Sequence, residues 1–228
     1  MRISNIFTST RKALWMGLIG CAGVLQAAHG DVIFSATSGV INSGGPGFGS
    51  ISNTFNQSGL STGYTSNVTD FNTYLAGNPT HTLVFLGFEW FSNRGTNSAS
   101  VTYNFGSVRS FDALALWNDE ASGIGLLNLL TSNDGINFAA LATGLAPTDH
   151  PSGSNYGADV FAFSATSAQY VRFDMSLCPQ APSTFTACAI GEVAFREATG
   201  NSVPEPGSWA LIGLGLACLT VARRRKSA

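Results

Sequence analysis

The chain has 228 residues, of which 11% are charged, against about 25% in a typical soluble domain. Residues 31–202 contain four arginines, no lysine and twelve acidic residues, a net charge of 4 − 12 = −8, and the remaining seven cations lie in the two ends of the chain. Phosphate binding requires a basic face, so this composition argues against nucleic acid as a partner. Glycine, serine, threonine and asparagine take the place of charged residues, which is typical of a secreted β-protein.

The first thirty residues have the charge order and length of a secretory signal peptide. Basic residues precede an apolar segment at 13–25, which is expected to be a signal helix, and small residues at 28–30 offer a cleavage site before Asp31. Cleavage at Ala27 is an alternative. So is lipidation of Cys21, because Leu18-Ile19-Gly20-Cys21 resembles a lipoprotein box. The sequence therefore predicts export, with residues 1–30 as the signal peptide.

Residues 31–202 have the length of one domain and the pattern of a β-protein. Turn-forming and aromatic residues alternate over 35–79, which indicates short strands and long loops, and Asp134-Gly135 between two apolar runs indicates a hairpin. Strands are expected at 82–91, 99–105, 111–117, 126–130, 138–141, 160–163, 169–175 and 191–195. No amphipathic segment of ten or more residues indicates a helix. The expected fold is therefore all-β, an antiparallel sandwich of two sheets.

Two cysteines, Cys178 and Cys188, lie between the two ends of the chain. An exported protein meets an oxidising compartment, so these two are predicted to form a disulfide. In the chain-entropy account, closing a loop of this length contributes about 2.5–3 kcal/mol.

The C-terminus combines two prolines, an apolar run and a basic end. Val203-Pro204-Glu205-Pro206 is followed by an uncharged run at 209–222 and by four cations at 223–226. The run covers about 21 Å as a helix, against a hydrocarbon core of about 30 Å. Including Gly207 and Ser208 gives a short transmembrane helix at 207–222, and the cations keep its end cytoplasmic.

This order of elements resembles the PEP-CTERM sorting tail of Gram-negative bacteria, with 203–228 as the sorting and anchor segment. The resemblance implies recognition by an exosortase, transient insertion in the inner membrane, and cleavage near Pro204-Glu205-Pro206. The body of the protein would then reach the cell surface or the exopolysaccharide matrix.

Three segments of the predicted β-domain resemble the closing half of the galactose-binding-like jelly roll, as in discoidin or coagulation-factor type C modules. They are Ser132-Asn133-Asp134-Gly135-Ile136-Asn137-Phe138, Ala168-Gln169-Tyr170-Val171-Arg172-Phe173 and Ile190-Gly191-Glu192-Val193-Ala194-Phe195. The half of the domain before Pro79 departs from that pattern, so an unrelated jelly roll is the alternative.

The resemblance to this fold implies a structural calcium as cofactor, with Asp70, Asn72 and Glu192 at the positions of its ligands. Calcium takes six to eight oxygens, so carbonyl groups would have to complete the set. The alternative is an Asx-turn at Asp70 and a Glu192 that is solvated or paired with arginine.

The resemblance also implies a ligand pocket on the loops at one end of the sandwich. Trp90, Arg94, Trp117 and Tyr156 lie in loops or near the ends of expected strands, so they are the candidate ligand-binding residues. The alternative for the two tryptophans is burial in the core or at its rim.

No catalytic site is expected. The domain has no nucleophile elbow and no zinc-type spacing, and the adjacent carboxylates of Asp119 and Glu120 do not define a glycosidase pair. The sequence thus predicts a non-enzymatic surface or matrix protein whose domain contacts extracellular polysaccharide. The alternatives are a structural protein without a small ligand and a hydrolase on a jelly-roll scaffold.

Overall fold

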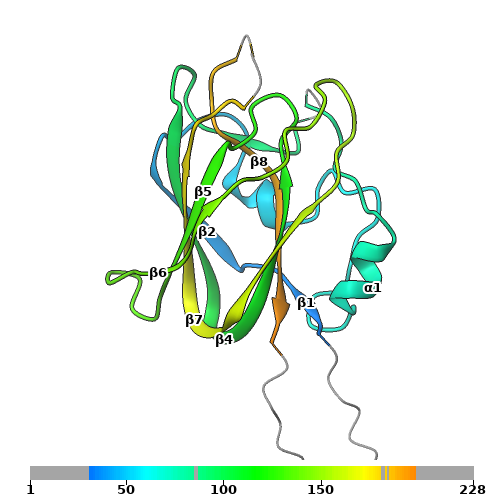
Figure 1. Ribbon diagram of the computed structural model, residues 1–228, viewed down its shortest axis with the longest axis vertical. Helices are drawn as coiled ribbons and strands as arrows, with labels where there is room; N and C mark the ends of the chain where they lie inside the picture. The colour runs from blue at the N-terminus through cyan, green and yellow to red at the C-terminus, as the bar shows by residue number, and fades with distance from the viewer. Residues whose placement is uncertain (1–30, 85–86, 181–182, 184, 199–228) are drawn as a thin grey trace, which may run out of the picture.

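A computed structural model describes residues 31–198 apart from 85–86, 181–182 and 184 (Figure 1). The signal peptide and the C-terminal tail predicted above lie outside the described residues. The strands are β1 (Ile33–Phe34), β2 (Ser38–Ser43), β3 (Trp90–Phe91), β4 (Ser98–Asn118), β5 (Leu126–Ser132), β6 (Ala139–Leu145), β7 (Asp159–Ser176) and β8 (Ala189–Glu197). The helices are the 3-10 helix η1 (Ile51–Phe55) and the α-helix α1 (Phe71–Ala76). No helix among the described residues is long and apolar enough to cross a membrane.

Two long strands organise the domain. β4 has 21 residues and β7 has 18, and they pair antiparallel along their length. The predicted strands 99–105 and 111–117 are the two halves of β4, and 160–163 and 169–175 fall in the two halves of β7. The pairing shifts register between Asn104 and Arg109, where Gly106 has a φ of 80°. Such an irregularity bends a strand without ending it.

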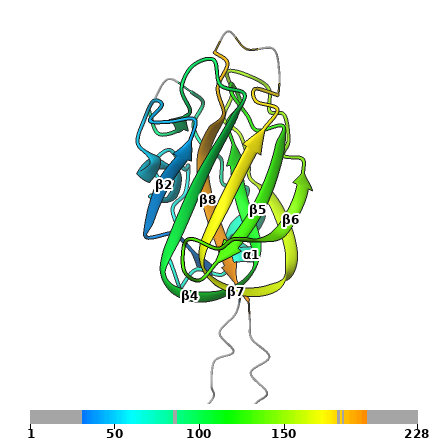
Figure 2. The same ribbon diagram turned by 90° about the vertical axis from the view of Figure 1, so that its left-hand side faces the viewer.

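The other strands pair with different halves of these two. β2 pairs with the first half of β4 and β5 with the second half of β7, so β2, β4, β7, β5 and β6 lie side by side on one face (Figure 2). β8 pairs with the second half of β4 on the other face. The expected antiparallel all-β sandwich is confirmed, but its two layers belong to one hydrogen-bonded sheet of eight strands folded over on itself.

The core lies between the two layers. Every second residue of the first half of β4 points inward, and these side chains meet those of β8 and of the second half of β7. The second half of β4 is buried on both sides, because Ala113, Ala115 and Trp117 pack against Phe71 and Tyr74 of α1. This double burial explains why 111–117 is almost continuously apolar in sequence.

The strand predicted at 82–91 is wrong except for its last two residues, which form β3. Three backbone N–H groups of this segment donate to side-chain oxygens and not to the carbonyl groups of a neighbouring strand. The N–H of Leu83 donates to Asn155, that of Val84 to Glu120, and that of Phe88 to Glu89. The described residues before β3, 82–84 and 87–89, therefore lie outside any strand.

The predicted hairpin and disulfide are confirmed. β5 and β6 pair antiparallel across the Asp134-Gly135 turn, and Cys178 is bonded to Cys188 just before β8 begins. The predicted last strand, 191–195, lies within β8.

β1 and β8 bring the two ends of the domain together. Ile33 pairs with Arg196 and Phe34 with Phe195, and both strands reach the lower end of the domain in Figure 1. β8 has nine residues and begins at Ala189. An extended strand of this length spans about 26–30 Å, so Ala189 lies at the other end of the domain. The disulfide therefore lies at the end of the sandwich opposite to the two ends of the described chain.

Candidate ligand-binding pocket

A cavity of about 760 Å³ opens at the disulfide end of the sandwich. It lies between the loops that precede β3 and β8 and the loop that follows β4. Its lining residues are Phe48, Gly49, Val84, Gly87, Glu89, Phe91, Arg94, Glu120, Ala121, Ser122, Ser152, Ser183 and Phe185.

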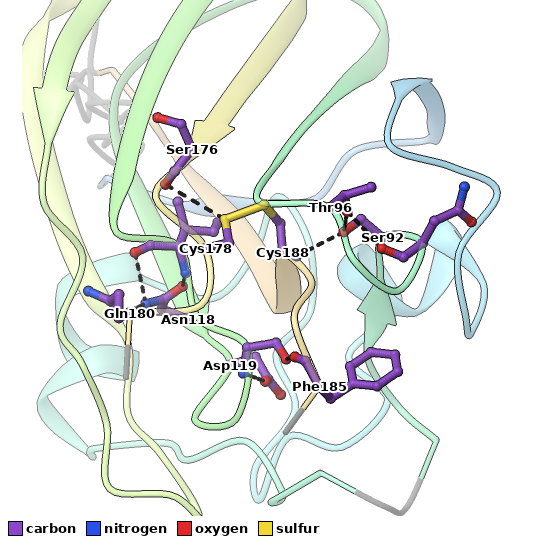
Figure 3. Close-up of a disulfide and its surroundings, with 12 residues drawn as sticks. Ser92, Thr96, Asn118, Asp119, Ser176, Cys178, Gln180, Phe185 and Cys188 are labelled. Atoms are coloured by element: carbon purple, nitrogen blue, oxygen red, sulfur yellow. Dashed lines mark hydrogen bonds between the residues drawn. A yellow bond between two sulfur atoms is a disulfide. The ribbon is translucent and has the colours of Figure 1, made fainter. Parts of the chain in front are cut away.

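The disulfide holds one wall of this cavity. Figure 3 shows the bond between Cys178 and Cys188 with Phe185 on the loop that it closes. The Ser92 hydroxyl accepts a hydrogen bond from the N–H of Cys188 at 2.8 Å. The same loop is tied to the end of β4, because Asn118 Nδ2 donates to Gln180 Oε1 at 2.7 Å.

Three phenylalanines form an apolar wall. The ring of Phe185 meets Phe48 edge-on at 5.5 Å between centroids and Phe91 edge-on at 5.7 Å. The guanidinium of Arg94 lies 6.0 Å from the centre of the Phe185 ring. Phe48 is 56% exposed, so part of this apolar wall faces solvent.

The loop that carries Phe48 lies close against the chain around β3. The backbone groups of Phe48 and Phe91 exchange two hydrogen bonds of 2.8 and 2.9 Å. Gly47 and Gly49 flank Phe48 with φ values of 76° and 74°, and a side chain at either glycine would collide with a backbone oxygen, of Phe91 or Glu89 respectively. Glycine at both positions thus allows the close approach.

Two carboxyl groups form the floor. Glu89 and Glu120 are 1% and 2% exposed, and one oxygen of each accepts a backbone N–H, from Phe88 and from Val84 at 3.1 Å. The second oxygen of each, Glu89 Oε1 and Glu120 Oε2, has no hydrogen-bond partner in the described part of the chain. Burial, with a smaller contribution from the charge of Glu120, raises the pKa of Glu89.

A third carboxyl group lies behind the floor. Asp119 Oδ1 accepts the N–H groups of Ala121 and Ser122 at 3.0 and 2.7 Å, which holds the turn after β4. Burial raises the pKa of Asp119 to about 7, and the neighbouring charge of Glu120 adds to this.

His81 does not neutralise these carboxyl groups. Its Nδ1 lies 3.7 Å from Glu89 Oε1, and the hydroxyl of Tyr156 lies 3.0 Å from the same nitrogen. Burial lowers the pKa of His81, so the ring is neutral at pH 7. Among the described residues, the carboxyl groups of the floor therefore have no arginine or lysine within 4.0 Å.

Of the four candidate ligand-binding residues, Arg94 lines the pocket. Trp90 and Trp117 are fully buried, and their indole N–H groups donate to the carbonyls of Pro46 and Pro79 at 3.0 and 2.9 Å. Tyr156 is 2% exposed and faces His81. The structure thus places these three in the core, which was the alternative for the tryptophans.

The three candidate calcium ligands have different surroundings. Asp70 caps α1 by accepting the N–H of Thr73 at 2.7 Å, and Asn72 contacts Asp31 and Arg196. Arg196, which Asn72 contacts, lies four residues after Glu192 on β8. About 13 Å of extended strand therefore separates the two positions. Glu192 is fully buried, and its Oε2 accepts the N–H of Gln57 at 2.8 Å while Oε1 has no partner among the described residues. Asp70 and Asn72 are therefore not brought to Glu192, the described residues hold no group of three or more His, Cys, Asp or Glu side chains placed for a metal ion, and calcium binding stays a prediction.

The pocket residues Phe48, Glu89, Phe91, Glu120 and Phe185 were not predicted from the sequence. One signal was present, since Glu89 is the single charged residue in an apolar run, Val84-Phe85-Leu86-Gly87-Phe88-Glu89-Trp90-Phe91. A lone carboxyl group in such a run is either buried or functional.

One comparison concerns the C-terminal tail. Residues 202–226 match the PEP-CTERM protein-sorting motif. The match includes Val203, Pro204, Glu205 and Pro206 and confirms the predicted PEP-CTERM tail, which covers about a tenth of the chain.

Other comparisons concern the β-domain. No curated protein matches the chain. Similar solved structures include chitosan-binding module 1 of a chitosanase/glucanase from Paenibacillus sp. IK-5, with 20% identity over 73% of this chain and 98% of that chain and a TM-score of 0.46. Another is the CBM32 of AlyQ in complex with 4,5-unsaturated mannuronic acid, with 14% identity over 73% and 99% and a TM-score of 0.44. Both are carbohydrate-binding modules. Likenesses at this level do not establish a shared site.

Proposed function

We propose that this PEP-CTERM protein is exported, sorted to the cell surface or exopolysaccharide matrix of a Gram-negative bacterium by an exosortase, and binds extracellular carbohydrate in the pocket at the disulfide end of its β-domain. Binding, not catalysis, is the proposed activity.

The observation that carries the proposal is the combination of groups in the pocket. A sugar ring has an apolar face of C–H groups and a rim of hydroxyls. The apolar wall of Phe48, Phe91 and Phe185 matches the first, while the polar side chains of Arg94, Glu89 and Glu120, which also line the cavity, match the second. Pockets that combine apolar surface with a few convergent polar groups are typical of small-ligand sites.

The position of the pocket suits a protein delivered by its C-terminal tail. The sorting motif follows the end of β8, whereas the pocket lies beyond the start of that strand. A tail held in the inner membrane, or attached to the surface after cleavage, would therefore leave the pocket directed outward.

A glycan array with the full-length chain tests the binding. We expect signal on a restricted set of sugars, competed by the same sugar in solution. Blank spots across neutral, acidic and amino sugars would contradict the proposal and favour a structural protein. Release of products from the sugars would favour the hydrolase.

The intact mass of the protein released from cells tests the sorting. We expect loss of the signal peptide and a second cleavage near Glu205. A mass that includes residues 203–228 would contradict processing by an exosortase.

A further inference from the structure

The ring of His81 is surrounded by more acceptors than a neutral imidazole can serve. The side chain is fully buried, its Nε2 lies 3.0 Å from the carbonyl oxygen of Ser58, and its Nδ1 lies 3.0 Å from the carbonyl oxygen of Thr82. A neutral ring carries one N–H group, and a carbonyl oxygen can only accept. While His81 is neutral, one of these two carbonyl groups therefore faces a ring nitrogen that has no proton to donate.

The hydroxyl of Tyr156 decides which carbonyl group that is. It lies 3.0 Å from Nδ1 and can donate its hydrogen to that nitrogen. Burial raises the pKa of this hydroxyl, so it keeps its hydrogen. The neutral ring of His81 therefore carries its proton on Nε2 and donates it to Ser58. Nδ1 and the carbonyl oxygen of Thr82 are then two acceptors that face each other, which is an unfavourable contact in a buried site.

A second proton, bound to Nδ1, would turn this contact into a hydrogen bond. The same nitrogen lies 3.7 Å from Oε1 of Glu89, a buried carboxylate oxygen without a hydrogen-bond partner among the described residues. An imidazolium would supply the counter-charge that this carboxylate lacks. Burial lowers the pKa of His81 and raises that of Glu89, while the bonds from the ring to the two carbonyl groups oppose the first of these shifts. Two groups this close titrate as one unit.

Two further carboxyl groups favour uptake of a proton by this pair. Glu120 and Asp119, on the turn after β4, add negative charge beside Glu89 when they are ionised. No arginine or lysine lies within 4.0 Å of these carboxyl groups in the described part of the chain. The remaining residues around the pair, from the segment before β7 and from β8, are Tyr156, His150 and Gly191.

The pair lies at the pocket. Glu89 lines the cavity, and so does Val84, two residues after Thr82. Residues 82–84 lie outside any strand, so contacts with side chains hold them in place. We propose that His81 and Glu89 form a proton switch that fixes residues 82–84 beside the pocket. At mildly acidic pH, Nδ1 takes up a proton, donates a hydrogen bond to the carbonyl oxygen of Thr82 and gains Glu89 as its counter-charge. The switch does not depend on what the pocket binds.

Nitrogen-15 NMR of the full-length chain, labelled at histidine, tests the switch without a ligand. The chain has three histidines, and the variants His29→Gln and His150→Gln identify the signals of the other two. We expect His81 to carry one proton, on Nε2, at about pH 7.5 and two protons at about pH 5. A ring with one proton at both pH values, or with two protons at both, overturns the switch.

Two variants test the pairing with Glu89. Glu89→Gln keeps the shape of the side chain and an oxygen for the N–H of Phe88 but removes the charge, so the proton affinity of His81 should fall about tenfold or more. The control Glu197→Gln changes the net charge equally at a site paired with Arg109, outside the pocket, and is expected to leave that affinity unchanged. Equal effects of the two variants would reflect the net charge of the domain and overturn the pairing.

Amide hydrogen exchange of the full-length chain tests the effect on the pocket. The N–H groups of Leu83 and Val84 donate to side-chain oxygens, so their exchange reports how firmly this segment is held. After correction for the intrinsic rates, we expect both amides to gain protection of about threefold or more between about pH 7.5 and about pH 5, the effect of one hydrogen bond. The gain should be absent in Glu89→Gln and at the amide of Ile33, at the other end of the domain. Protection that does not change with pH, or that changes equally at Ile33, overturns the proposed fixing of the segment.

Discussion

The hydroxyl of Ser122 donates a hydrogen bond of 2.9 Å to the carbonyl oxygen of Phe185. It joins the turn after β4, which carries Glu120 of the floor, to the loop closed by the disulfide, which carries Phe185 of the apolar wall. The two sides of the pocket are therefore linked by protein contacts before any ligand binds. Such preorganisation reduces the cost of ordering loops on binding.

Removing the disulfide should weaken both the fold and the pocket. The double variant Cys178→Ser/Cys188→Ser is expected to lose about 2.5–3 kcal/mol of unfolding free energy in the chain-entropy account, and to bind sugar more weakly because Phe185 is less restrained. Chemical denaturation and calorimetry measure the two effects. Adding a reductant should reproduce them in the wild type and change nothing in the variant, while an unchanged stability in the double variant would contradict the role given to the bond.

Phe185→Ala should lower carbohydrate affinity about tenfold or more, because burying one aromatic side chain against a ligand contributes about 1.5–3 kcal/mol. Ile136→Ala is the matched control, since Ile136 is 81% exposed on the turn between β5 and β6 and outside the pocket. Titration of both variants with the same sugar decides the point. Equal affinities in the two variants would exclude the Phe185 wall as a binding surface.

Stability should fall as the pH rises from about 4 to about 7. The pKa of Asp119 is raised from 3.8 to about 7 in the folded state, so in this window the folded protein binds more protons than the unfolded chain. The difference in pKa corresponds to on the order of 4 kcal/mol. Asp119→Asn removes this contribution, and urea titrations at pH 5 and pH 8 should show a smaller loss for the variant. Parallel pH profiles for the two proteins would show that Asp119 does not carry the effect.

Calcium is predicted to act through Glu192. If the buried Oε1 of Glu192 binds the ion, chelator lowers the melting temperature of the wild type and leaves that of Glu192→Gln unchanged. Differential scanning fluorimetry with calcium and with chelator measures both. Identical melting temperatures of the wild type with calcium and with chelator would contradict the predicted calcium binding.

Local patterns in the sequence predicted much of the fold. The Asp134-Gly135 turn indicated the hairpin, and the two cysteines of the domain indicated the disulfide. The continuity of β4 was not predicted, because Gly106-Ser107 between two apolar runs has the composition of a turn. The strand continues through that bend because it pairs with β7, more than fifty residues later, and such a pairing leaves no local signal.

Most residues of the pocket were not predicted from the sequence, for a related reason. Its residues come from loops far apart in the chain, such as those of Phe48, Glu120 and Phe185. Trp90 and Trp117 were candidates because they lie at the ends of apolar runs, but carbonyls from distant prolines satisfy their indole N–H groups within the core. Arg94 was a candidate and lines the pocket, in the loop that follows β3.

Hydrogen–deuterium exchange of the full-length chain, with and without a saturating sugar, tests most directly where carbohydrate binds. We predict slower exchange in the segments that carry Phe48, Phe91, Glu120 and Phe185, with no change in β2 or β6. Protection confined to the face formed by β2, β4 and β7, or no protection at saturation, would contradict the assignment of the pocket.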